Sequence, residues 1–124
     1  MGRVSAWFAG YAAVFGVPDR GGDVVVPGAF GAASAVPLLW QHGGAPVGRA
    51  EVREDARGLR VIGEVTAPGL AALVRSGAVT GLSFGFRALA AERGAWRVLR
   101  RVELIEVSLV RRPMQLLARV HAVA

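Results

Sequence analysis

Ser83 and His42 are the residues of this chain whose types could together break an acyl bond. Ser83 lies in the run GLSFGF, with Gly81 and Gly85 two positions to either side. On a strand, these three positions share one face, so the bare glycines predict room for a substrate backbone beside the hydroxyl. Glycine also weakens a strand and often marks a bulge, and the pattern alone leaves open that Ser83 is a filler residue.

His42 follows the apolar run VPLLWQ and precedes GGAP, which predicts a strand end beside a flexible loop. Such positions commonly display catalytic groups. A neutral imidazole can act as a general base toward a serine hydroxyl. A surface histidine that caps a turn is an equally good interpretation of this position.

A serine–histidine pair needs a third group to hold the other ring nitrogen of the histidine. Glu103 and Glu106 are candidates because both lie in the apolar segment VELIEVSLV, where a carboxylate is costly to bury without a partner. A regular strand turns the two toward opposite faces. Position alone does not choose between them, and both could instead pair with Arg97, Arg100 or Arg101.

Composition excludes several other chemistries. The 124-residue chain has the length of one domain, contains no cysteine and has two histidines, which excludes a thiol nucleophile and argues against a zinc site. It contains no phosphate-binding loop and no dinucleotide fingerprint. Asp19, Asp23 and Asp55 lack the spacing of a calcium loop. We therefore expect neither a metal nor a cofactor.

The apolar pattern argues against a membrane span, and the charge gives only weak support for nucleic-acid binding. The formal net charge is +6, and every basic residue is arginine. Lysine and asparagine are both absent, which suggests a GC-rich genome and makes the arginine excess partly a mutational bias. A basic surface also suits an acidic protein partner. No segment approaches the ~20 apolar residues of a membrane span, so we expect a soluble, cytoplasmic protein.

Glycine and proline recur at the short intervals typical of strands joined by turns. Pro27 is expected to end a strand or to start a helical turn, and the last strand to bend or break near Arg100 or Arg101. The expected strands are residues 5–15, 23–30, 36–42, 47–53, 59–65, 79–87 and 96–110.

The segment 68–76 is the best helix candidate. Pro68 suits a first turn, and Leu70, Leu73 and Val74 share one face. Together these elements predict a mainly β (α+β) domain with one or two helices.

Five segments, in this order, resemble the prohead (capsid maturation) protease family of tailed phages. Each is weak alone, but the ordered set covers nearly the whole chain and is specific. The segments are GYAAVFGVPDRGGDVVVPGAF (10–30), VPLLWQH (36–42), PVGRAEVREDARGLRVIGEV (46–65), GAVTGLSFGFRA (77–88) and RVELIEVSLVRRPMQLLARV (101–120).

The family is similar to the herpesvirus assembly protease, and the resemblance implies a herpesvirus-protease-like, single-domain β-barrel with one to three flanking helices over residues 1–124. It implies His42 as general base, Ser83 as nucleophile and Glu106 as third triad member, where the herpesvirus relatives have a second histidine. Glu103 is the alternative third member.

The herpesvirus enzymes carry an arginine pair shortly after the third member, which contributes to the oxyanion hole. Arg111 and Arg112 occupy a comparable place. Pro113 follows them and restricts Arg112 to extended conformations.

The resemblance implies a serine endopeptidase that cleaves scaffold, or the scaffolding segment of the major capsid protein, inside a prohead assembling in the bacterial cytoplasm. It also implies self-cleavage. It points to a homodimer as well, because dimerisation activates the herpesvirus enzymes. It implies no membrane and no specific nucleic acid as partner. The short chain fits a phage-derived particle such as a gene transfer agent.

Two other functions are compatible with the residues. One is a β-barrel assembly protein that has lost catalysis, which the intact Ser83, His42 and Glu106 argue against. The other is an arginine-rich nucleic-acid-binding barrel, which requires exposed aromatics among the arginines. Phe84 and Trp40 lie in strands that look buried, so this function ranks last.

Overall fold

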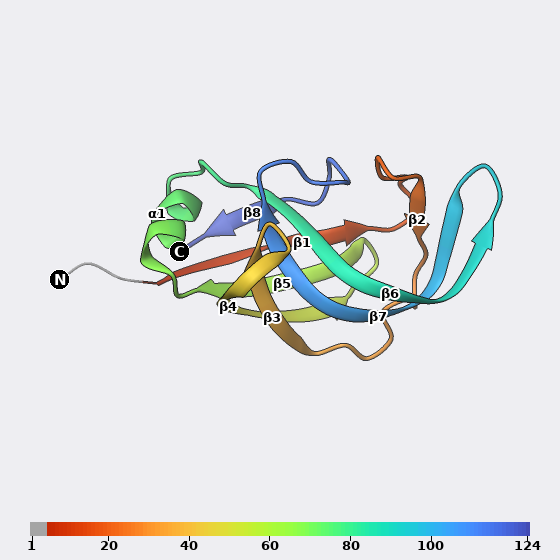
Figure 1. Cartoon of the computed structure of the whole chain (residues 1–124), viewed down its shortest axis with the longest axis horizontal. Coiled ribbons are helices and arrows are strands. Elements are labelled where there is room, and N and C mark those ends of the chain that lie inside the picture. Colours follow the sequence, from red (N-terminus) through yellow and green to blue (C-terminus); the bar gives the residue numbers. More distant parts are fainter. Residues whose placement is uncertain (1–4) are drawn as a thin grey trace.

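Eight strands and one helix form residues 5–124, the part of the chain that this computed structural model describes (Figure 1). This composition confirms the mainly β fold class with one helix. The elements are β1 (Ala6–Val14), β2 (Asp23–Val25), β3 (Ala35–Trp40), β4 (Gly43–Glu54), β5 (Gly58–Val65), α1 (Pro68–Arg75), β6 (Gly81–Arg93), β7 (Arg97–Val110) and β8 (Val120–Val123).

The strands belong to one curled sheet with the order β2-β7-β3-β4-β5-β1-β8, and β6 pairs with β7 outside this path. β2 and β3 run parallel to β7, whereas β6 is antiparallel to it. The curl brings the start of β6 back to the far end of the path, where Gly81 bridges Arg119. The Leu82 amide donates to the Ala118 carbonyl at 2.9 Å. The sheet therefore folds around one core.

The core is filled by branched side chains from most of the strands and from α1. Burial of each leucine-sized side chain contributes roughly 1.5–3 kcal/mol. Because β6 and β7 supply several of these side chains, the two strands are held rigidly along the region around position 83. The largest buried side chains are Leu38, Leu59, Leu82, Leu99, Leu109, Val61, Val65, Val74 and Val107.

The hairpin of β6 and β7 extends further than the sequence pattern predicts. Residues 88–93 continue β6, yet they are exposed and therefore show no alternation of apolar and polar residues. The last strand does not break, because β7 is continuous through Arg100 and Arg101. An irregularity does occur at the expected place, since the register shifts between Ala90 and Ala91 and leaves Arg100 as an extra residue of β7.

The strand before Pro27 ends at Val25, which agrees with one of the two expected roles of this proline. The run after Pro27 forms turns and not a helical segment, and the Glu54 carboxylate accepts the Gly28 and Phe30 amides at 2.7 and 2.8 Å. The strand β8 was not predicted. In α1 the buried positions are Ala71 and Val74, while Leu73 is exposed. Within residues 5–124, no helix has the length and apolarity needed to cross a membrane.

Candidate active site

A two-residue turn between β3 and β4 presents His42. Trp40 pairs with Gly43, so Gln41 and His42 form the whole turn, with φ angles of 53° and 61°. Two positive φ values suit the twist of a hairpin, but this turn usually has Asn-Gly. Each non-glycine residue held in this conformation costs of order 1–3 kcal/mol. The expected strand thus ends at Trp40, and surrounding contacts must hold the histidine in its strained turn.

Three hydrogen bonds to β7 and the residue after it hold this turn. The Gln41 amide donates to the Leu109 carbonyl at 3.0 Å, and the His42 amide donates to Ser108 Oγ at 3.0 Å. The Arg111 amide donates to Gln41 Oε1 at 2.8 Å. The position of the imidazole is therefore fixed relative to β7 and not only to its own hairpin.

Glu106 on β7 contacts the imidazole directly. The His42 Nδ1 and Glu106 Oε1 atoms lie 2.5 Å apart, and Ser108 Oγ donates to Glu106 Oε2 at 2.7 Å. The Glu106 side chain is 8% exposed, against 41% for His42. An ionised carboxylate can only accept hydrogen bonds, so Nδ1 is the donor. In the neutral ring, Nε2 then carries the lone pair and can accept a proton.

Glu103 lies in a different environment. Its carboxylate pairs with Arg87 at 3.1 Å, and both side chains are exposed. The expectation that the two glutamates face opposite sides is wrong, because β7 has an extra residue between them and they lie opposite Gly85 and Arg87 on one face of β6. The structure brings Glu106, and not Glu103, to His42.

Ser83 lies on β6 directly across from Ser108 of β7, and Leu39 of β3 lies opposite Ser108 on the other side. Ser83 and His42 therefore flank the same position of β7. They line one groove of about 420 Å³ together with Gln41, Val110, Arg111, Arg112 and Met114. No hydrogen bond within residues 5–124 joins the Ser83 hydroxyl to the imidazole, although both groups line the same groove.

The glycines beside Ser83 do not leave room for a substrate, and that prediction is wrong. A Cβ on Gly85 would collide with Glu106 Oε1 and lie 2.9 Å from Glu106 Cδ. A Cβ on Gly81 would lie 2.5 Å from the Val110 carbonyl oxygen and 2.9 Å from Pro113 Cδ. The glycines make space for the chain's own groups, and Gly85 makes it for the carboxylate that holds His42.

Arg111 and Arg112 line the groove at the end of β7. The Arg111 guanidinium lies 5.5 Å from the centre of the Trp40 ring, within cation–π range. Both side chains are exposed. They place positive charge beside Ser83, but no hydrogen bond to the serine accompanies it within the described residues.

Sequence reasoning missed Ser108, which is fully buried and contacts both His42 and Glu106. A signal was present, because positions 106 and 108 share a strand face. His121, the other histidine, lies on β8 with its ring 5.7 Å from that of Tyr11. Among residues 5–124, no group of three or more His, Asp or Glu side chains could hold a metal ion.

Comparison with known proteins matches this chain to a family, to a phage protein and to solved structures. The family model described as "Caudovirus prohead serine protease" matches residues 2–124. The prohead protease of Enterobacteria phage HK97 is 39% identical, over 64% of this chain and 41% of the phage protein. The protease of KSHV, in a crystal structure with a hexapeptide phosphonate inhibitor, has a TM-score of 0.62 at 15% identity. That likeness covers 97% of this chain and 65% of the KSHV chain, and it concerns the fold.

Proposed function

Because the chain belongs to the caudovirus prohead serine protease family, we propose that residues 1–124 form a serine endopeptidase domain that acts in capsid maturation. The chain spans 41% of the length of the HK97 protease. The observation that carries the proposal is the His42–Glu106 contact at 2.5 Å in the groove that also holds Ser83.

In the proposed mechanism, His42 Nε2 takes the Ser83 proton as Oγ attacks the peptide carbonyl. The imidazolium, held by Glu106, then gives this proton to the departing amine, and an acyl-enzyme ester remains. His42 next takes a proton from water, whose oxygen attacks the ester, and returns it to Ser83 Oγ. Substrate binding must bring Oγ within reach of Nε2, because such contacts often tighten only in the complex.

The negative charge that develops on the carbonyl oxygen needs donors aimed at it. Arg111 and Arg112 line the groove beside Ser83 and are the proposed source of this positive charge. Removal of one such donor typically lowers kcat by about 10²- to 10³-fold.

The proposed substrate is the scaffold, or the scaffolding segment of the major capsid protein, inside the assembling prohead. Family membership supports this substrate class. The net charge of +6 suits an acidic segment of such a substrate. A homodimer, as in the herpesvirus enzymes, belongs to the same proposal.

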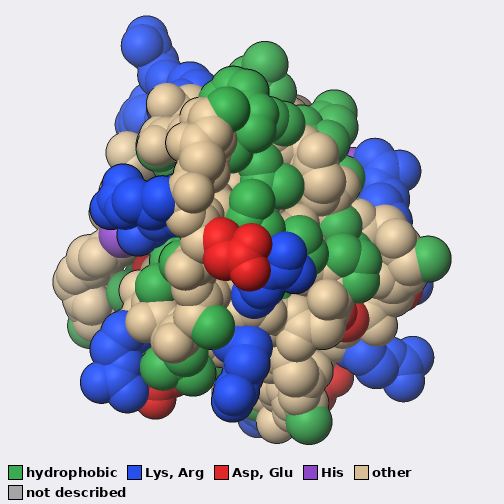
Figure 2. Space-filling view, turned by 90° about the vertical axis from the view of Figure 1, so that its right-hand side faces the viewer, with side chains coloured by type: hydrophobic (Ala, Val, Ile, Leu, Met, Phe, Trp, Pro, Cys, Tyr) green, Lys and Arg blue, Asp and Glu red, His purple; other side chains and the backbone are tan. Residues whose placement is uncertain are grey.

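The nucleic-acid-binding alternative has little support on the face shown in Figure 2. There the arginine side chains are scattered, with hydrophobic and other side chains between them, and do not form one continuous stripe. A basic stripe is the usual electrostatic footprint of such proteins.

Covalent labelling with a fluorophosphonate tests the proposal. We expect one adduct per chain, located on Ser83 by peptide mass mapping, and none in Ser83→Ala. Co-expression with the capsid protein and scaffold from the same genome should give a truncated product only with the wild type. An unlabelled chain that leaves both partners intact would instead support the inactive assembly protein.

The substitution Gly85→Ala tests whether the place of Glu106 matters. The added Cβ collides with the Glu106 carboxylate, so this carboxylate must move away from His42. Misplacement of a catalytic group by about 1 Å can cost about 100-fold, and we expect a fall of that order in kcat/KM.

Gly69→Ala in α1 is the matched control, since a Cβ there meets nothing within 4 Å. It should leave kcat/KM unchanged. Thermal unfolding of both variants separates a local displacement from loss of the fold. Full activity in a folded Gly85→Ala protein would show that the Glu106 position is unimportant.

A further inference from the structure

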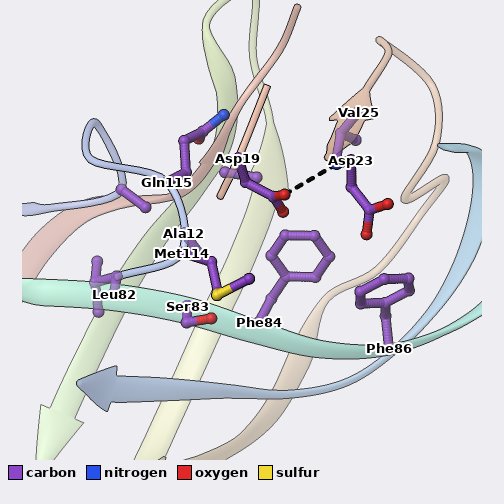
Figure 3. Close-up of a pocket in the computed structure, with 12 residues that line it drawn as sticks. Ala12, Asp19, Asp23, Val25, Leu82, Ser83, Phe84, Phe86, Met114 and Gln115 are labelled. Carbon is purple, nitrogen blue, oxygen red and sulfur yellow. Dashed lines mark hydrogen bonds between the residues drawn. The ribbon is translucent and has the colours of Figure 1, made fainter. Parts of the chain in front are cut away.

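A second cavity opens beside Ser83, and His42 does not line it. It measures about 110 Å³ and shares only Ser83 and Met114 with the groove that holds His42. Figure 3 shows Phe84 and Phe86 on one side of this space, the Met114 thioether above Ser83, and the Asp19 and Asp23 carboxylates beyond them. A substrate whose carbonyl lies at Ser83 would therefore have an adjacent side chain at the mouth of the cavity.

The two carboxylates of the cavity differ in what they already bind. Both oxygens of Asp23 accept hydrogen bonds from Arg97, at 2.7 and 2.8 Å. These hydrogen bonds, which Arg97 donates to Asp23, are the main cause that raises the pKa of Arg97 above its usual value. The charge of Asp23 is thus neutralised within the protein.

Asp19 retains an unused oxygen. Its Oδ1 accepts the amides of Gly21 and Asp23, each at 2.9 Å. Its Oδ2 accepts no hydrogen bond within residues 5–124. The cavity therefore combines apolar walls with one net negative charge.

The loop that carries Asp19 is clamped in place. Gln115, 8% exposed, accepts the Val14 amide at 2.6 Å and donates to the carbonyls of Val14 and Val17 at 3.0 and 2.7 Å. The Arg20 amide donates to the Met114 carbonyl at 2.9 Å. These bonds tie both sides of the cavity together, so Asp19 is held in position before any ligand arrives.

We propose that this cavity binds the side chain of the residue whose carbonyl Ser83 attacks, and that it selects lysine. The aliphatic stem would lie between Phe84 and Met114, and the ammonium would reach Asp19. The unbranched Met114 side chain can shift to admit it. This inference rests on the proposed serine protease function.

Other side chains fit the cavity less well. An apolar side chain of the same length would desolvate the Asp19 carboxylate without giving it a partner, which is unfavourable. A glutamate would place like charges together. A lysine satisfies both the apolar walls and the carboxylate.

The test compares two inhibitors, the diphenyl phosphonate analogues of lysine and of its uncharged isostere norleucine. Ser83 Oγ attacks phosphorus, phenoxide leaves, and the hydroxyl proton passes through His42 to the leaving group. Intact mass measures the rate of adduct formation, so recognition of a long substrate is not required. We expect the wild type to react at least about 10-fold faster with the lysine compound than with the norleucine compound. The norleucine compound lacks the charge that pairs with Asp19, and loss of a charge partner in a partly enclosed site typically weakens binding by at least this factor.

The variant Asp19→Asn keeps an oxygen for the Gly21 and Asp23 amides and removes the charge. We expect it to lower the lysine-to-norleucine ratio to near one, because the lysine compound loses its charge partner and the norleucine compound no longer desolvates a carboxylate. Glu92→Gln, at the far tip of the β6–β7 hairpin where Glu92 pairs with Arg100, should keep the wild-type ratio.

Fluorophosphonate labelling separates the two levels of inference. If Ser83 takes this small label but the wild type does not prefer the lysine compound, or Asp19→Asn keeps the preference, the lysine pocket is wrong and the protease assignment stands. If Ser83 takes no label at all, the proposed function and the pocket fail together.

Discussion

Replacement of Ser83 by alanine should lower kcat/KM for peptide hydrolysis by about 10⁴- to 10⁶-fold. The hydroxyl is the only part of Ser83 that forms the acyl-enzyme, and among the described residues that line the groove no other side chain carries a hydroxyl or thiol. Ser83 is 8% exposed on a rigid strand, and alanine is smaller and fits the same space. We therefore expect an unchanged fold, with substrate affinity largely kept.

Ser76→Ala is the matched control, because the Ser76 hydroxyl lies at the end of α1 and donates to the Leu73 carbonyl at 3.1 Å. Initial rates on a peptide that spans the capsid cleavage site, with thermal unfolding of both variants, measure the effect. Comparable hydrolysis by Ser83→Ala and the wild type would remove Ser83 as the nucleophile. Loss in both serine variants would indicate damage to the fold.

The strand pattern could be read from sequence because the buried strands alternate or are continuously apolar. Glu106 and Glu103 were expected on opposite faces of β7, but the register shift at Ile105 puts them opposite Gly85 and Arg87, which share one face of β6. Which face meets the histidine depends on the parallel pairing of β3 with β7, where Leu39 lies opposite Ser108. These positions are far apart in sequence, and local periodicity contains no information about such pairing.

The conformation of the His42 turn also could not be predicted from the local sequence. Gln-His lacks the Asn-Gly signal of a turn with two positive φ angles, so residues 36–42 looked like a strand to its end. Contacts from Ser108, Leu109 and Arg111 stabilise the strained turn. Local preference is overridden here by contacts from β7, and the histidine is held where a free loop would not hold it.

The role of Gly85 was read incorrectly for a related reason. A missing Cβ shows that something comes close, but it does not say whether this is a ligand or the chain itself. The register of β6 on β7 places Gly85 opposite Glu106, and this register is a tertiary property.

Replacement of Glu106 by glutamine should lower kcat/KM by about 10²- to 10⁴-fold. Ser108 Oγ donates to one carboxylate oxygen, which favours the amide oxygen at that place and turns the amide nitrogen toward His42. An NH₂ group can only donate, so Nδ1 must become the acceptor and Nε2 carries the ring proton. In that tautomer the imidazole cannot take the Ser83 proton. The negative charge that stabilises the imidazolium is lost as well.

The matched control is Glu103→Gln, which makes the same chemical change on the same strand. Its carboxylate pairs with Arg87 at the surface, and such pairs contribute about 0–1 kcal/mol, so activity should stay within about 2-fold of the wild type. Rates over a range of pH, together with the ¹⁵N shifts of the His42 ring, report both activity and tautomer. If Glu103→Gln abolished hydrolysis and Glu106→Gln did not, the third member would be Glu103, acting in an arrangement different from the one seen here. If only Glu106→Gln loses activity and its ring carries the proton on Nε2, the effect comes from the tautomer and not from unfolding.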